Sequence, residues 1–283
     1  KAAFRQACDC LKLDGKTIGL EPTRLRVLEL NDLQAAAPQA RFISAEAQLE
    51  KLRLFKDEQE IAAMQRAVDI AQQAFTETLP FIRPGVTEKE IAAELTIRLL
   101  RAGSEPEFLF QPLIASGPNS ANTHALPGER KLAEGDLLII DWGATYQGYC
   151  SDLTRTLAIG SIDPELEQIH RLVLAANAAG RAACQPGPSA GSVDVATRAV
   201  ITAGGYGAYF THRTGHGLGM EAHEAPYIYA ENEESLAPGM SFTIEPGIYL
   251  PGKGGVRIED NVVITPDGAN CLSSLPRELI VIS

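Results

Sequence analysis

The sequence predicts an α+β fold: a curved antiparallel sheet with two halves related by a pseudo-two-fold axis, covered by helices. The main observation is the order helix, helix, strand and hairpin, which occurs twice between residues 57 and 264. A second observation is that each hairpin carries one pair of acidic residues. Because the two halves share no residue-level repeat, the duplication is a hypothesis about the structure.

Composition and charge exclude several functional classes. The 283 residues are 45% hydrophobic and 22% charged, which is ordinary for a globular protein. A net charge of −11 leaves no basic excess to bind nucleic acid or an anionic membrane. No apolar run approaches the roughly 18 residues of a membrane span. Five scattered cysteines, an odd number, indicate a reducing compartment such as the cytoplasm.

The first 50 residues are expected to contain a short helix, a strand near residues 17–20, a helix over 22–36 and a strand near 41–44. These elements are too few to enclose a core of their own. We therefore expect residues 1–50 to be the C-terminal remnant of an N-terminal domain, and residues 51–283 to form the main domain.

The main domain is predicted to begin with a long amphipathic helix over residues 57–82, because apolar residues recur at helical spacing after an acidic first turn. The sequence Thr87-Glu88-Lys89-Glu90 is a capping box that starts a second helix, to about residue 101. Strands are predicted near residues 108–115 and 136–141, with a return strand near 151–159.

The second half repeats this order. Helices are predicted over residues 164–184 and 192–203, and strands over 241–250, 257–264 and 278–282. His170 lies on the first of these helices among charged residues, so we expect its side chain to be solvated.

Each predicted hairpin would place its two acidic residues directly opposite each other. The midpoint between Asp141 and Asp152 falls in the loop between two predicted strands. The midpoint between Glu245 and Glu259 is Gly252, within a turn-rich segment. Directly opposed residues have Cβ atoms roughly 4.5–5.5 Å apart, and two carboxylates at about 5 Å repel by roughly 3 kcal/mol at an effective dielectric of about 20. Two such pairs suggest a site for multivalent cations.

Histidines support this interpretation. Four of the five histidines lie in segments rich in glycine and proline, where the backbone can approach a ligand closely: His124, His212, His216 and His223. A lone histidine is more often structural than functional, but this grouping reverses that expectation.

The candidate metal ligands are four carboxylates and one imidazole: Asp141, Asp152, His216, Glu245 and Glu259. This mostly hard-oxygen set suits Mn²⁺ or Co²⁺ better than a thiolate-held zinc, although Zn²⁺ fits as well. Four negative charges match two divalent ions, which can share a water and lower its pKa. The alternatives are solvated carboxylates on surface hairpins, which the apolar strand residues before Asp141 and Glu245 disfavour, and a structural Ca²⁺ site, which would not explain the histidines. Arg257, on the same strand face as Glu259, either orients a carboxylate, contacts substrate or lies at the surface.

With these residues in place, the chain from about residue 53 onward resembles the M24 metallopeptidases of the pita-bread fold, especially Xaa-Pro dipeptidases (prolidases) and Xaa-Pro aminopeptidases. The segments that carry the resemblance are His124-Ala125-Leu126-Pro127-Gly128, Asp141-Trp142-Gly143-Ala144, Gly148-Tyr149-Cys150-Ser151-Asp152-Leu153-Thr154-Arg155-Thr156, Thr214-Gly215-His216-Gly217-Leu218-Gly219, His223-Glu224-Ala225-Pro226, Thr243-Ile244-Glu245-Pro246-Gly247-Ile248-Tyr249 and Gly255-Val256-Arg257-Ile258-Glu259-Asp260. The short interval from Glu245 to Glu259 is similar to that of prolidases.

The resemblance implies a catalytic domain with two divalent ions, Mn²⁺ before Co²⁺ or Zn²⁺, that hydrolyses Xaa-Pro bonds of proline-containing peptides through a metal-bridging hydroxide. It implies that Glu245 accepts the proton of the bridging water. It also implies that His124 and His223 contact the scissile carbonyl or the tetrahedral intermediate, and that His212 contacts the substrate. A cytoplasmic homodimer is expected on the same basis.

One departure concerns substrate length. Some archaeal-type prolidases carry an arginine for the dipeptide carboxylate where this chain has Tyr227, which leaves room for longer peptides. Two further alternatives are an M24 hydrolase of other amino-terminal specificity and a non-catalytic binding module on the same fold.

Overall fold

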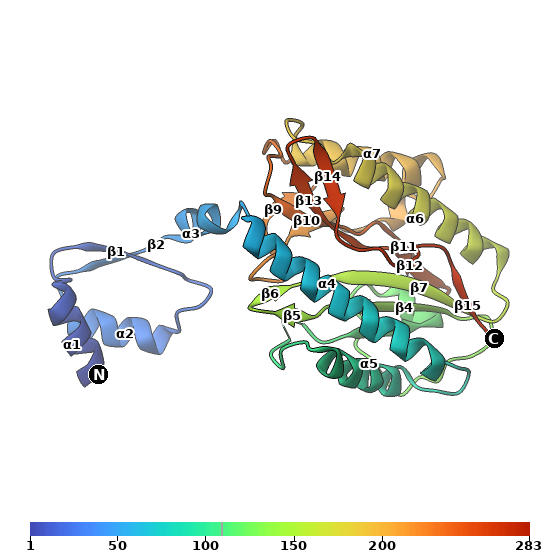
Figure 1. Ribbon diagram of the computed structural model, residues 1–283, viewed down its shortest axis with the longest axis horizontal. Helices are drawn as coiled ribbons and strands as arrows, with labels where there is room; N and C mark the ends of the chain where they lie inside the picture. Colours follow the sequence, from blue (N-terminus) through green and yellow to red (C-terminus); the bar gives the residue numbers. More distant parts are fainter. Residues whose placement is uncertain (109) are drawn as a thin grey trace. The chain divides into compact units, whose positions relative to one another are not determined.

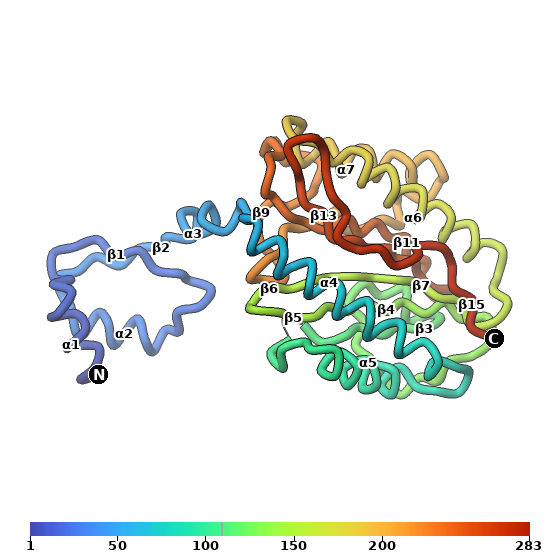
Figure 2. Tube along the Cα trace, viewed as in Figure 1, coloured from blue at the N-terminus to red at the C-terminus, as the bar shows by residue number. Residues whose placement is uncertain are grey.

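The computed structural model describes residues 1–108 and 110–283, which divide into two compact units, Lys1–Arg53 and Leu54–Ser283 (Figures 1 and 2). In the first unit, β1 and β2 pair in parallel, and Cys8 and Ala37 are its only buried apolar side chains. Its assignment as a domain remnant stays a prediction. The elements of this unit are α1 (Ala2–Leu11), β1 (Thr17–Leu20), α2 (Val27–Ala36), β2 (Arg41–Ser44) and α3 (Glu46–Arg53).

The second unit begins with two helices whose caps are readable in the sequence. The Asp57 carboxylate accepts hydrogen bonds from the backbone amides of Gln59 and Glu60, which starts α4 (Glu58–Thr78). The predicted capping box of Thr87 and Glu90 is confirmed at the start of α5 (Glu88–Ala102). Both helices pack through apolar faces, as their sequence periodicity predicts.

The first half of the sheet has the strand order β15-β7-β4-β3, antiparallel except for the parallel pair of β15 with β7. The predicted strand near 108–115 is limited to β3, and its residue 109 lies outside the described part of the chain. The strands are β3 (Leu113–Ser116), β4 (Leu137–Trp142), β7 (Leu153–Ile159) and β15 (Ile280–Ile282), with a short hairpin of β5 (Thr145–Tyr146) and β6 (Tyr149–Cys150).

The expected direct opposition of Asp141 and Asp152 is wrong. Asp141 pairs with Thr154, because the hairpin turns at Gln147 and Gly148, which both have positive φ as in a type I′ turn. The turn centre lies one residue later than predicted, which moves the partner by two residues. Because side chains alternate with a period of two, Asp152 still shares the sheet face of Thr154.

The second half of the sheet has the order β14-β13-β10-β8-β9. Three of its strands, β8, β9 and β14, are absent from the sequence prediction: β8 and β14 are segments of three and four residues that contain glycine, and β9 contains Pro226, which argues against a strand. The elements are α6 (Pro164–Ala183), α7 (Ala190–Ala203), β8 (Gly215–Gly217), β9 (Glu224–Ile228), β10 (Ser241–Ile244), β11 (Gly247–Leu250), β12 (Gly254–Arg257), β13 (Asp260–Thr265) and β14 (Gly268–Cys271).

The second acidic pair has the predicted register. Ile244 pairs with Asp260 on one side, and Gly247 pairs with Arg257 on the other, so the intervening Glu245 and Glu259 occupy opposed positions. At this point each predicted long strand divides into two.

The two half-sheets meet at the same place. The backbone amide of Glu259 donates to the carbonyl of Thr154, and these residues form an isolated antiparallel bridge between the halves. A second link lies nearby, where the buried Arg155 guanidinium donates to Asp260. The carboxylates therefore lie at a seam of the fold.

Helices cover both halves of the sheet (Figure 1). α4 and α5 pack on the half that contains β3, β4 and β7, and α6 and α7 pack on the half that contains β8 to β13. In the first half, Trp142 stacks on Phe75 of α4 with ring centroids 4.6 Å apart. The predicted α+β arrangement with a repeated helix-pair and sheet unit is confirmed. No helix in the described residues is both long and apolar enough to cross a bilayer.

The expectation that His170 is solvated is wrong. Its side chain is buried on the face of α6 that also buries Leu166, Ile169 and Val173, because helical periodicity places these residues together. Burial lowers the pKa of His170 to about 4, and its Nε2 has no hydrogen-bond partner among the described residues.

We expect His170 to reduce stability in mild acid. Its pKa rises on unfolding from about 4 to about 6.5, so the unfolded chain binds the extra proton and stability falls as the pH drops through this window. Between pH 7.5 and pH 5 the loss is about 2 kcal/mol. Urea unfolding at both pH values should show that His170→Leu removes about this much of the acid sensitivity. Equal acid sensitivity in both proteins would contradict the assignment.

Candidate metal centre

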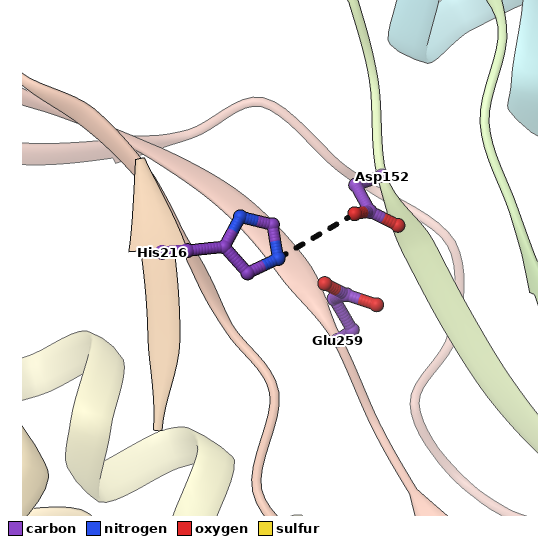
Figure 3. A group of neighbouring side chains, drawn as sticks. All are labelled: Asp152, His216 and Glu259. Atoms are coloured by element: carbon purple, nitrogen blue, oxygen red, sulfur yellow. Dashed lines mark ion pairs between the residues drawn. The ribbon is translucent and has the colours of Figure 1, made fainter. Parts of the chain in front are cut away.

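Three side chains converge at the seam (Figure 3). Asp152 immediately precedes β7, His216 is the middle residue of β8, and Glu259 lies between β12 and β13. One ligand atom of each lies within 4.8 Å of the others, and all three residues are buried. Segments more than 100 residues apart in the sequence thus supply one group of donors.

Glu245 joins this group through His216. Its Oε1 lies 3.3 Å from His216 Nε2, and the Oδ2 of Asp152 lies 3.7 Å from the same nitrogen. His216 Nδ1 donates to the carbonyl of Gly217 at 3.1 Å, which leaves Nε2 with its lone pair in the neutral ring. The lone pair of His216 Nε2 thus faces the carboxylates of Asp152 and Glu245. A cation between these three groups would stabilise the arrangement. The donor set therefore fits a divalent metal ion.

The electrostatics of the group are those of buried like charges. Burial, then the charges of Glu259 and Asp141, raise the pKa of Asp152 well above its usual range. Burial and then Glu245 do the same for the pKa of Glu259. Burial raises the pKa of Glu245 to about 7 and, with the nearby His223, lowers that of His216 to about 3. The protein thus holds acids that favour protonation and an imidazole that stays neutral, unless a cation compensates.

Asp141 stands beside this group rather than within it. Its Oδ2 accepts a hydrogen bond of 2.6 Å from Arg257, while its Oδ1 is buried and has no hydrogen-bond partner among the described residues. A buried carboxylate oxygen without a donor is costly, and a metal ion supplies the missing partner. The structure therefore brings four of the five predicted ligands together and leaves the fifth with a free oxygen.

Arg257 is not a surface residue. Its guanidinium is buried and contacts Asp141, the Tyr249 hydroxyl at 2.9 Å and the Thr154 hydroxyl at 3.2 Å. The Thr154 hydroxyl in turn donates to Glu259 Oε2 at 2.6 Å. Of the predicted alternatives, the structure favours an arginine that orients a carboxylate.

The remaining predicted histidines differ in their surroundings. His223 is exposed, and its ring meets His216 edge-on with centroids 4.1 Å apart. His124 is also exposed, with Nδ1 3.3 Å from the Thr123 hydroxyl. Both ring nitrogens of His212 are engaged: Nδ1 donates to the Arg213 carbonyl, and Nε2 accepts from the Tyr249 hydroxyl at 2.9 Å. Burial lowers the pKa of His212 to about 4.

Three residues of the site are absent from the sequence interpretation: Thr154, Tyr249 and Arg213. Thr154 and Tyr249 lie inside recognised segments, but their hydrogen bonds join strands whose pairing is not visible locally. Arg213 lies over the ring of Tyr227, with its guanidinium carbon 4.7 Å from the ring centroid. Alternation along β8 and β9 was the one signal that could have paired Tyr227 with the His216 strand.

Because the carboxylates repel one another, we expect one substitution to have opposite effects on stability without and with a bound metal ion. With a chelator present at pH 8, Glu259→Gln should be more stable than the unchanged protein by about 1–2 kcal/mol, because a buried charge among like charges is removed. With excess Mn²⁺ the order should reverse, since ligand binding to the folded state contributes about 2.7 kcal/mol at 100 times Kd. Thermal unfolding with and without Mn²⁺ measures both. A variant less stable under both conditions would contradict this account of the site.

The chain is similar to known metallopeptidases over most of its length. Residues 62–266 match the model of metallopeptidase family M24. An uncharacterised peptidase, YqhT, of Bacillus subtilis is 40% identical over 94% of this chain and 75% of the relative. The solved Xaa-Pro dipeptidase from Bacillus anthracis superposes with a TM-score of 0.93 at 40% identity, covering 99% of this chain and 78% of that chain.

A second solved structure, the X-Pro aminopeptidase from Thermotoga maritima, gives a TM-score of 0.91 at 37% identity, with 99% of this chain and 79% of that chain covered. These similarities confirm the pita-bread fold expected from the sequence. The chain is a member of metallopeptidase family M24.

Proposed function

We propose that this chain is a dinuclear metal-dependent peptidase that hydrolyses Xaa-Pro peptide bonds, as a dipeptidase or an aminopeptidase P. The observation that carries the proposal is the group of buried carboxylates around the unprotonated Nε2 of His216. Relatives named Xaa-Pro dipeptidase, including that of Pyrococcus furiosus at 38% identity, support the substrate class.

The metal centre would be held by the five predicted ligands, with Mn²⁺ as the first candidate and Co²⁺ or Zn²⁺ as alternatives. In this assignment His216 and Glu245 would hold one ion, and Glu259, Asp152 and the free Oδ1 of Asp141 would supply the remaining donors. When bound, such ions lower the pKa of water and polarise the scissile carbonyl. Arg257 keeps Asp141 in place through its short hydrogen bond.

Glu245 is the proposed general base. Its side chain is only 15% exposed, and its Oε1 lies 3.3 Å from His216 Nε2, so the carboxylate is within reach of a water at the proposed metal centre. The Thr243 hydroxyl, 3.3 Å from Oε1, restricts the orientation of the carboxylate. In this role Glu245 accepts a proton from the attacking water and delivers it to the departing proline nitrogen.

His223 and His124 are the proposed donors to the substrate carbonyl. Both are exposed, so an N–H of either ring can reach a bound peptide, and charge that develops on the carbonyl oxygen is stabilised by such donors. Partial burial of its ring against His216 lowers the pKa of His223, so at neutral pH the ring is neutral and carries one N–H. We place His212 behind them as the residue that holds Tyr249. Substrate contact by a nitrogen of His212 requires one of its two hydrogen bonds to be replaced.

Two other functions are less well supported. A non-catalytic module would have no use for three carboxylates that repel one another around His216, with a fourth, Asp141, beside them. An M24 hydrolase with another amino-terminal specificity would use the same centre, so only assays with different substrates distinguish it from an Xaa-Pro peptidase. We further propose that the protein is a cytoplasmic homodimer. The absence of a disulfide among its five cysteines supports the compartment, and the dimer rests on family resemblance.

Peptide hydrolysis tests the proposal. With Mn²⁺ added, we expect Ala-Pro or Ala-Pro-Ala to be cleaved with kcat/KM about 10- to 100-fold above matched peptides in which alanine replaces proline. Glu245→Gln should lower kcat by about 10²- to 10⁴-fold, because the proton acceptor is lost. Glu167→Gln, at an exposed position of α6, is the control and should keep full activity. Equal rates on proline and alanine peptides would favour the broader hydrolase, and no cleavage with metal bound would remove the proposal.

The proposed role of His223 can be tested separately from metal binding. His223→Phe keeps a ring against His216 but removes the N–H, so we expect kcat to fall by about 10²- to 10³-fold while the bound metal content stays the same. Metal analysis and steady-state kinetics on the same sample measure both. Unchanged kcat, or loss of metal in proportion to activity, contradicts the assigned role.

A further inference from the structure

One cation of the site, Arg213, is held by an aromatic ring rather than by an ion pair among the described residues. The side chain of Arg213 takes part in no ion pair or side-chain hydrogen bond in the part of the chain that the structure describes, whereas Arg257 is paired with Asp141. The guanidinium carbon of Arg213 lies 4.7 Å from the centroid of the Tyr227 ring. A ring face holds a guanidinium by cation–π attraction and leaves its N–H edge free for an acceptor.

Tyr227 fixes where this free edge lies. In the β8–β9 pair, Tyr227 is directly opposite His216, so the two side chains project from the same face of the sheet. Opposed residues have Cβ atoms roughly 5 Å apart. The ring that supports Arg213 is therefore the immediate neighbour of the imidazole in the metal centre.

The charges of the centre leave Arg213 unbalanced. If two divalent ions balanced the four carboxylates, the positive charges of Arg257 and Arg213 would both remain, and of these two only Arg257 forms an ion pair, with Asp141, among the described residues. The positive charge of Arg213 is therefore not held by an ion pair, and its guanidinium lies over the ring of Tyr227, the residue opposite His216. A site that holds an uncompensated guanidinium beside a metal centre favours a ligand with a negative group.

The chemistry and the length of the ligand follow from this position. A planar guanidinium matches a carboxylate through two parallel hydrogen bonds. One peptide residue spans at most about 3.6 Å, so a receptor adjacent to His216 can reach a carboxylate one residue beyond the scissile bond. In a longer peptide that position is a neutral amide.

We propose that Arg213, supported by Tyr227, binds the free C-terminal carboxylate of the substrate and thereby selects dipeptides over longer peptides. This proposal rests on the proposed function, since the scissile bond must lie at the metal centre. Arg213 is then a specificity residue that touches substrate, and Tyr227 is a positioning residue that acts through Arg213.

The test compares Ala-Pro with its C-terminal amide, which differ only in the negative charge. The unchanged protein should prefer the acid by about 30-fold in kcat/KM, the effect expected for a hydrogen-bonded charge. Arg213→Gln should reduce this ratio to within about threefold of unity, and Arg213→Lys should retain part of it as a point charge. Arg171→Gln, an exposed arginine of α6, is the matched control and should keep the full ratio.

Substitutions of Tyr227 provide a second test of the proposal. Tyr227→Phe keeps the ring face and should preserve the acid preference, whereas Tyr227→Leu should lower it at least fivefold because the guanidinium loses its support. Binding is measured independently of turnover by calorimetry with reduced-bond Ala-Pro analogues that end in an acid or an amide. The ratio of their Kd values should follow the same order across the variants.

The two proposals fail in different ways. If Xaa-Pro peptides are cleaved but the acid-to-amide ratio is near unity, or is the same in Arg213→Gln, carboxylate recognition by Arg213 is wrong and the peptidase assignment stands. If no peptide is cleaved but the acid analogue binds better than the amide through Arg213, the peptidase assignment is wrong and the anion site stands. A ratio abolished by Arg171→Gln would also overturn the specific role of Arg213.

Discussion

Mutual repulsion of carboxylates buried at the seam between two half-sheets is the constraint on which this structure depends. Asp152, Glu245 and Glu259 lie around one neutral imidazole, and burial together with neighbouring charge raises the pKa of each acid. Such a group is unfavourable by itself, because each ionised carboxylate loses hydration and faces its neighbours. It becomes favourable when cations compensate, so the same residues that weaken the metal-free fold create its affinity for metal.

The fold supports this group from both sides. Thr154 pairs with Asp141 in one half-sheet, bridges to Glu259 of the other, and donates its hydroxyl to the Glu259 carboxylate. Arg257 holds Asp141 from the opposite half. Positions that join the halves are therefore the positions that orient the donors, and movement at the seam would disturb the fold and the site together. This coupling explains why backbone segments so distant in sequence can hold one geometry.

Much of this was predictable from sequence, for physical reasons. Helix caps such as Thr87 with Glu90 act locally, and the opposition of Glu245 and Glu259 follows from a turn centred on Gly252. The opposition of Asp141 and Asp152 failed because a one-residue change in the turn centre shifts the register by two. His170 was misjudged because charged sequence neighbours say nothing about the helix face that it shares with buried residues. Arg213 was missed because its partner, Tyr227, lies on a strand that contains Pro226, which argues against a strand in the sequence.

Diffraction from crystals grown with Mn²⁺, with data collected at the manganese absorption edge, tests the central claim most directly. The account predicts two anomalous peaks roughly 3.5–4 Å apart, with His216 Nε2 on one ion, Glu259 in contact with both, and the free Oδ1 of Asp141 on a metal. A single peak, peaks outside this group, or no peak at saturating Mn²⁺ would contradict it.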